Sequence, residues 1–432
     1  MKKTILITST LFISLILLSL IPSTFYESFG LKSVDLYSDI RKSKGKDSLI
    51  ARQIFVDSCQ EGVTCFEDYS KNKTEKTKFL KAIFNLKNNS INKVRIAYFG
   101  DSYIDGDILT AYLRDSLQAK WGGRGVGFIP ITSHLNYFRQ TIGHTFKGFD
   151  NYNMLKQSKF DNNLAAGGFC FIPTEGNYVQ FSGVNISPRH KDFHEVNIFY
   201  QSNESHNVSV ISDNKTEQIT LVPSKHIQSY SLKDVNSRKL NLYFPASENL
   251  LLYGVSFEDN TGIFLDNFAS KGNSGLGLAK ITQTNHRFFD SLQSYNLVVL
   301  QFGLNVVSAN TTKVDWYLKA MKIVIETYKT NYPNATILLV SVPDRSMKKN
   351  GAYETMPSIP MLVNGQRKLA QETEIVFYDL FTAMGGENSM VDLVNATPAM
   401  ANGDYTHLKF NGGKKIANIL MGTINYEYEK YV

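Results

Sequence analysis

Cysteine is scarce in this chain, which has three cysteines among 432 residues. That number is too small for a disulfide-rich scaffold, and the spacings match no zinc-site pattern. Cys59 and Cys65 lie close enough in sequence to allow one small disulfide loop. Cys170 would then remain as a small buried apolar residue, and no cysteine is expected to act as a nucleophile.

A strong excess of charge of one sign is also missing. The chain has 46 Lys and Arg against 39 Asp and Glu, a net charge of +7, and residues 71–95 alone account for that excess. The remainder is close to neutral, so the composition argues against a nucleic-acid partner. We expect the basic stretch to be a solvated helix face, with contact to an anionic lipid or polymer as the alternative. Apolar residues make up 43% of the chain, which excludes a disordered or collagen-like protein.

Long hydrophobic runs are absent except at the N-terminus. Lys2 and Lys3 precede an uncharged, mostly apolar run from Thr4 to Ile21. This pattern is typical of a secretory signal peptide or of an uncleaved membrane anchor. No small-x-small cleavage pattern stands out after the run, which favours the anchor. Either alternative predicts an exported protein of the periplasm or cell envelope.

Two patterns of secondary structure alternate along the rest of the chain. Apolar strands and amphipathic helices alternate before about residue 133 and again after 259, which predicts a parallel sheet with helices on both faces. Between them, short β-rich runs are separated by Asn, Ser, Asp, Pro and Gly, which is typical of a β-sandwich. The predicted fold class is therefore α/β, with a parallel sheet interrupted by an inserted β-sandwich.

This organisation predicts five segments. Residues 1–25 are the signal peptide or anchor, and residues 26–92 are a stalk that ends in a helical segment. Residues 93–133 and 259–432 form the two parts of the α/β domain, and residues 134–258 form the insert. The chain contains no internal repeat or low-complexity tract.

Candidate catalytic residues follow the predicted strands. Gly100-Asp101-Ser102 comes directly after an apolar strand, so the serine should lie at the carboxyl end of the sheet, where ligands bind in open α/β folds. The helix expected next would favour developing negative charge near this serine. The tripeptide alone is weak evidence, because three common residues recur by chance.

Three further segments could complete a site. Asp404 and His407 are three residues apart, a spacing that lets a carboxylate orient one imidazole nitrogen and leaves the other to accept a proton. Asn305 follows another apolar strand, and its amide could donate to an oxyanion. The flexible turn Lys271-Gly272-Asn273-Ser274-Gly275-Leu276 could contribute a backbone N–H. Taken singly, a helix-capping Asp with a surface His explains Asp404 and His407 better than a catalytic pair does, and a capping role is the alternative for Asn305.

Together and in this order, the four segments resemble the SGNH (GDSL-type) hydrolase family. The resemblance implies a flavodoxin-like sheet and catalysis by Ser102, Asp404 and His407. It also implies an oxyanion hole made by the Ser102 N–H, the Gly275 N–H and the Asn305 amide, with Gly272 as the alternative to Gly275. No metal or cofactor is expected.

Residues 100–107 and the segment Trp121-Gly122-Gly123-Arg124-Gly125-Val126-Gly127-Phe128 are most similar to bacterial peptidoglycan O-acetylesterases. In that group a β-sandwich resembling a carbohydrate-binding module interrupts the hydrolase domain at the corresponding place. One departure is Tyr103, where the family often has His. The similarity implies removal of the C6 O-acetyl group of muramic acid, with acetylated peptidoglycan as the partner.

Several alternatives stay open at this point. The same triad would serve an exported polysaccharide O-acetyltransferase, and a non-catalytic wall-binding protein would retain the fold alone. The insert could be a structural lid without sugar affinity, and the sequence does not choose among aromatic residues such as Tyr178 and Tyr200. A metal site at His190 and His194 lacks a third ligand, and the glycines at 122–127 lack the Gly-Lys-Ser/Thr of a phosphate loop.

Overall fold

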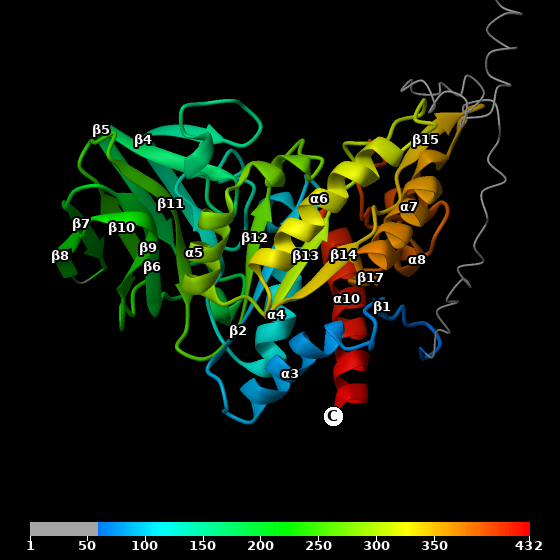
Figure 1. The fold of residues 1–432 in the computed structure, drawn as a ribbon, viewed down its shortest axis with the longest axis horizontal. Coiled ribbons are helices and arrows are strands. Elements are labelled where there is room, and N and C mark those ends of the chain that lie inside the picture. Colours follow the sequence, from blue (N-terminus) through cyan, green and yellow to red (C-terminus); the bar gives the residue numbers. More distant parts are fainter. Residues whose placement is uncertain (1–58, 214) are drawn as a thin grey trace, which may run out of the picture. The chain divides into compact units, whose positions relative to one another are not determined.

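The computed structural model describes residues 59–213 and 215–432 (Figure 1). The predicted leader at residues 1–25 and the first part of the predicted stalk lie outside the described residues. Within the described ranges, no helix is both long and apolar enough to cross a membrane.

A six-stranded sheet forms the centre of the α/β part, with strand order β1-β17-β14-β13-β2-β12. Five strands run parallel: β2 (Lys93–Gly100), β12 (Gly262–Ala269), β13 (Leu297–Gln301), β14 (Thr336–Val340) and β17 (Val376–Tyr378). Their near-continuous apolar sequences are typical of strands buried on both faces. The predicted α/β class is therefore confirmed.

One edge of this sheet corrects the prediction of a parallel sheet. Strand β1 (Glu67–Asp68) pairs antiparallel with β17. It lies within residues 26–92, the segment predicted to be a stalk, and precedes the first described helix. Its backbone forms hydrogen bonds with the edge of β17, which would otherwise present unpaired N–H and C=O groups. The sheet is thus only partly parallel.

Two groups of helices pack together in this part of the chain. In one, α10 (Phe410–Tyr431) packs on α4 (Thr110–Trp121) and α3 (Glu75–Lys87). In the other, α6 (Asp315–Asn331) packs on α5 (Gln283–Gln293) and α7 (Ser358–Thr373). Two short helices, α8 (Leu380–Met384) and α9 (Ser389–Asn395), precede α10. The buried face of α3 includes Phe79, Leu80 and Ile83, whereas Phe84 is 40% exposed.

A second, antiparallel sheet has its own hydrophobic core. Its strand order is β8-β7-β10-β5-β11-β6-β9, with β3 paired to β11 and β4 paired to β5. The strands are β3 (Gly127–Pro130), β4 (Gly143–Asn153), β5 (Phe169–Ser182), β6 (Glu195–Ser202), β7 (His206–Ser212), β8 (Lys215–Leu221), β9 (Ser224–Leu232), β10 (Lys239–Tyr243) and β11 (Leu250–Glu258).

Hydrogen bonding joins these nine strands in one sheet, so it does not separate the two layers expected of a sandwich. The sequence led us to expect short strands, but not all of them are short, because β5 is 14 residues long. Strand β3 pairs with β11 although it precedes residue 134. The division of the chain into domains stays a prediction.

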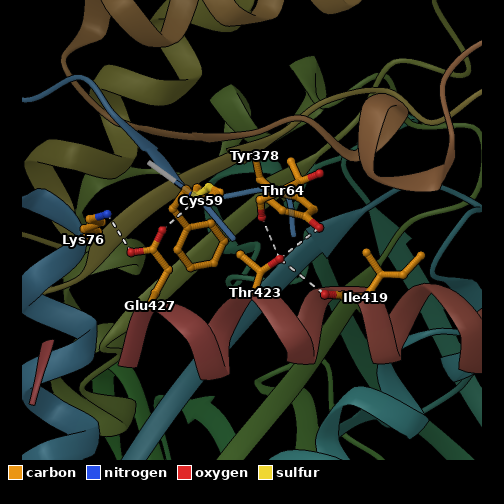
Figure 2. The surroundings of a disulfide bond; sticks show 9 residues. Cys59, Thr64, Lys76, Tyr378, Ile419, Thr423 and Glu427 are labelled. Atoms are coloured by element: carbon orange, nitrogen blue, oxygen red, sulfur yellow. Dashed lines mark hydrogen bonds and ion pairs between the residues drawn. A yellow bond between two sulfur atoms is a disulfide. The ribbon is translucent and has the colours of Figure 1, made fainter. Parts of the chain in front are cut away.

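The N-terminal end of the described chain is bound to α10 by a hydrogen bond and an ion pair (Figure 2). Cys59 and Cys65 form the disulfide that their spacing allowed. The Glu427 carboxylate accepts the Phe66 N–H at 3.0 Å and pairs with the Lys76 ammonium at 2.6 Å. Glu427 is almost fully buried, so its charge depends on these two partners.

Glu427→Ala should therefore lower the free energy of unfolding by about 2 kcal/mol, because it leaves the Phe66 N–H without its acceptor and Lys76 without its counter-charge. Urea unfolding measures the loss. Glu429→Ala is the matched control, since that side chain is 72% exposed and should change stability by less than about 0.5 kcal/mol. Equal losses in the two variants would contradict the anchoring role of Glu427.

Candidate active site

Ser102 lies just beyond the carboxyl end of β2. Gly100, the last residue of β2, pairs with Gln301 of β13 and Ala269 of β12, so the turn begins between two neighbouring parallel strands. A Cβ atom on Gly100 would stand 2.8 Å from the Ile104 side chain, so any larger residue there would require Ile104 to move. Asp101 accepts the Tyr103 N–H at 3.0 Å, which closes the turn around the serine.

The three residues of the implied triad lie together although about 300 positions separate Ser102 from His407 in the sequence. Ser102 Oγ is 2.9 Å from His407 Nε2, and His407 Nδ1 is 2.7 Å from Asp404 Oδ2. The other Asp404 oxygen accepts the backbone N–H groups of Thr406 and His407, each at 3.0 Å. With Nδ1–H donating to Asp404, the Nε2 lone pair faces the serine hydroxyl.

Asp404 is held in its charged form. Partial burial raises the pKa of this carboxyl, but hydrogen bonds from His407 and from the Thr406 and His407 N–H groups outweigh burial and place the pKa below its ordinary value. The carboxylate is therefore ionised at neutral pH and can stabilise a cationic imidazole. The Asp404 and His407 side chains are 51% and 41% exposed, so the site opens to solvent.

The implied oxyanion donors converge on Asn273, a buried residue that the sequence analysis did not single out. The Gly275 N–H donates to Asn273 Oδ1 at 2.9 Å, and Asn305 Nδ2 donates to the Asn273 carbonyl at 3.0 Å. Asn305 has a second N–H on the same nitrogen, whereas Gly275 has only one. Gly272 is exposed with φ +77°, and a Cβ there would meet no atom within 4 Å.

A buried ionic cluster lies directly after the serine turn. Asp107 accepts hydrogen bonds from Arg114 of α4 (2.9 Å), Arg139 of the β3–β4 connection (2.7 Å) and Asn267 of β12 (3.1 Å). Burial raises the Asp107 pKa, but the two guanidinium groups hold it well below the ordinary range. The sequence analysis quoted Asp107 within its motif but missed this role, since neither arginine shows a spacing that marks it.

Asp101 has the opposite environment. It is fully buried, and burial raises the pKa of its carboxyl to about 6, although hydrogen bonds from backbone N–H groups oppose the rise. Those N–H groups belong to Tyr103, Leu304 and Gly303, so this carboxyl joins the serine turn to the loop that carries Asn305.

Asp101→Asn should change how stability depends on pH. Between about pH 4 and pH 6 the folded wild type holds a proton on Asp101 that the unfolded chain has lost, so wild-type stability falls as pH rises through this range. Asparagine does not titrate, so the variant lacks this pH dependence of stability, but its amide keeps an acceptor oxygen. Its stability relative to wild type should rise by about 2 kcal/mol from pH 4 to pH 7. Thermal and urea unfolding across this range check the difference, and parallel curves would contradict it.

Comparisons with known proteins bear on the fold. No family model matches the chain, and no curated protein matches it either. A solved peptidoglycan O-acetylesterase is similar with a TM-score of 0.68 and 18% identity, covering 84% of this chain and 99% of that chain. Its likeness confirms the fold that the SGNH resemblance implied.

Two other solved structures are similar over smaller parts. A family two carbohydrate esterase from Clostridium thermocellum has 14% identity and a TM-score of 0.26, covering 67% of this chain and 100% of that chain. An acetyl xylan esterase has 22% identity and a TM-score of 0.28, covering 37% of this chain and 80% of that chain. Both TM-scores are too low to add to the comparison.

Proposed function

We propose that this protein is an SGNH-type serine esterase that removes O-acetyl groups from a cell-wall polysaccharide, with the C6 O-acetyl of muramic acid in peptidoglycan as its substrate. The observation that carries the proposal is the continuous hydrogen-bond chain from Ser102 through His407 to Asp404 at the carboxyl end of the sheet. That chain is the arrangement required for a serine nucleophile and its general base.

In the proposed reaction, Ser102 Oγ attacks the acetyl carbonyl carbon while His407 Nε2 accepts the hydroxyl proton. Asp404 stabilises the resulting imidazolium. The C–O bond to the sugar then breaks, and His407 returns the proton to the sugar oxygen. Water, deprotonated by His407, attacks the acetyl-serine, and acetate leaves as the proton returns to Ser102 Oγ.

The negative charge that develops on the carbonyl oxygen needs donors. We assign the Ser102 N–H and the second N–H of the Asn305 amide, the first being held by Asn273. The third donor is either the Gly275 N–H, once Asn273 Oδ1 releases it, or the Gly272 N–H. Asn273 thereby orients the donors without touching the substrate.

Replacement of the triad should abolish turnover of an activated acetate ester. Ser102→Ala and His407→Ala are expected to lower kcat by at least about 10³-fold, and Asn305→Ala by about 10²–10³-fold, because each removes a group needed in the transition state. Asn310→Ala, an exposed asparagine five positions further along the chain, is the matched control for Asn305 and should keep wild-type turnover. Wild-type rates in either triad variant would refute the assignment.

The leader predicted from the sequence supports a place in the cell envelope, and an uncleaved leader would hold the enzyme at the outer face of the cytoplasmic membrane. The insert, about residues 134–258, is proposed to be a β-sandwich that helps to position the polysaccharide. Its separate apolar core supports an independent layer of structure. We also propose that residues 93–133 and 259–432 form the two parts of the hydrolase domain.

The substrate assignment predicts acetate release when the purified protein is incubated with native O-acetylated peptidoglycan. Acetate is quantified with and without a soluble acceptor glycan, and Ser102→Ala serves as the blank. Cleavage of acetylated xylan without cleavage of peptidoglycan would overturn the substrate and keep the esterase. Transfer of acetyl to the acceptor as the main outcome would favour the acetyltransferase.

A further inference from the structure

Three exposed aromatic side chains lie on segments that contact residues next to the triad in the chain. Tyr353 is 38% exposed, Phe138 43% and Tyr137 94%. Tyr353 lies in a hairpin formed by β15 (Ser346–Lys349) and β16 (Ala352–Thr355), and the other two lie in the connection between β3 and β4. Figure 1 shows β4 and β15 on different sides of strands β12 and β13. Exposed apolar surface of this kind often marks a ligand site.

The first aromatic pair adjoins Asp404. The Tyr353 ring stacks on the Tyr405 ring with 3.6 Å between centroids and 10° between planes. The Ser346 N–H donates to the Tyr405 carbonyl at 3.1 Å, so the hairpin holds this loop at two points. Tyr405 has φ +53°, a left-handed conformation that is unfavourable for a bulky residue. Such strain persists where surrounding contacts enforce it and is concentrated at functional sites.

The inner ring of the second aromatic pair is Phe410, which follows His407 in the sequence, whereas Tyr405 of the first pair precedes it. Phe138 stacks on Phe410 with 4.9 Å between centroids and 24° between planes. The same connection contacts the serine turn, because His134 Nε2 is 3.2 Å from Asp105 Oδ2. A Cβ on Gly106 would stand 2.5 Å from the Phe138 ring, so the glycine permits this close approach.

Resting on the proposed function, we propose that these two pairs are platforms for sugar rings of one glycan strand, one on each side of the sugar whose acetyl group lies at Ser102. Each pair presents an exposed ring, Tyr353 or Phe138, that is held in place by an inner ring. A ring already fixed loses little conformational entropy on binding. Its apolar face matches the C–H face of a pyranose, and neither outer ring carries a charge that would select an ion.

The openness of the site also fits a polymer. With Asp404 and His407 about half exposed, a strand can lie across the triad without threading into a closed pocket. The Phe138 platform comes from the connection between two strands of the second sheet, so the segment from β3 to β4 forms part of the catalytic site. The insert then contributes to substrate binding through this connection, beside any surface of its own.

Binding of the full-length Ser102→Ala protein to insoluble peptidoglycan tests the platforms without turnover. Sedimentation is measured on native polymer and on polymer freed of O-acetyl groups by mild base. Adding Tyr353→Ala or Phe138→Ala should weaken binding to both polymers up to about tenfold, in line with one lost aromatic contact. Tyr353→Phe keeps the ring and should bind as the parent does.

Phe84→Ala is the matched control, because Phe84 is 40% exposed and lies on α3, which precedes the opposite end of β2. Unchanged binding in Phe84→Ala together with weakened binding in the two platform variants supports the proposal. Parent-like binding in both platform variants overturns it, as does weakening only in Tyr243→Ala, an exposed ring of β10 in the second sheet. Parent binding too weak to detect also overturns it.

Acetate release by the wild type is scored separately. If acetate is released but the platform variants bind like the parent, the esterase proposal is supported and the platform proposal is refuted. If no acetate is released but the platform variants bind more weakly than the parent, the platform proposal is supported and the esterase proposal is refuted.

Discussion

The buried carboxylate of Asp107 holds the parts of this molecule together. It accepts hydrogen bonds from Arg114 of α4, Arg139 of the β3–β4 connection and Asn267 of β12. One carboxylate therefore joins the serine turn to α4, to the central sheet and to a connection between two strands of the second sheet. Two guanidinium groups share this carboxylate in a space with almost no solvent. Removing the Asp107 carboxylate would leave two buried guanidinium groups without a counter-charge, so its loss would strongly destabilise the fold.

The pKa values of three carboxyl groups in or near the triad differ because the groups have different surroundings. Two guanidinium groups hold the pKa of Asp107 well below its ordinary range, whereas burial raises the pKa of Asp101 to about 6 although backbone N–H groups donate to it. Asp404 is partly exposed and bonded to His407, which keeps it charged. Three aspartates thus have different roles: Asp107 joins several segments, Asp101 links two loops, and Asp404 orients the imidazole.

Much of the α/β part follows from local sequence. Strands β2, β13 and β14 are largely apolar runs with Gly, Asn or Pro nearby at their ends, and β17 lies between Glu374 and Asp379. Their approximate extents can be recognised in the sequence because strands buried on both faces are almost entirely apolar. The order of Ser102, Asn305, Asp404 and His407 also points to one edge of the sheet. Parallel strands bring their carboxyl ends to the same edge, so Ser102 and Asn305, which come shortly after β2 and β13, must lie near each other there. The position of Asp404 and His407 depends instead on the loop that precedes α10.

Contacts between distant segments decided the rest. Strand β1 is two residues long and forms only because the edge of β17 is open, and nothing in Glu67 or Asp68 marks a strand. The pairing of Arg139 with Asp107, the convergence of the oxyanion donors on Asn273 and the stacking of Tyr353 on Tyr405 join residues with no sequence periodicity between them. Sequence patterns report which face of an element is apolar, whereas side-chain partners depend on how the elements pack in space.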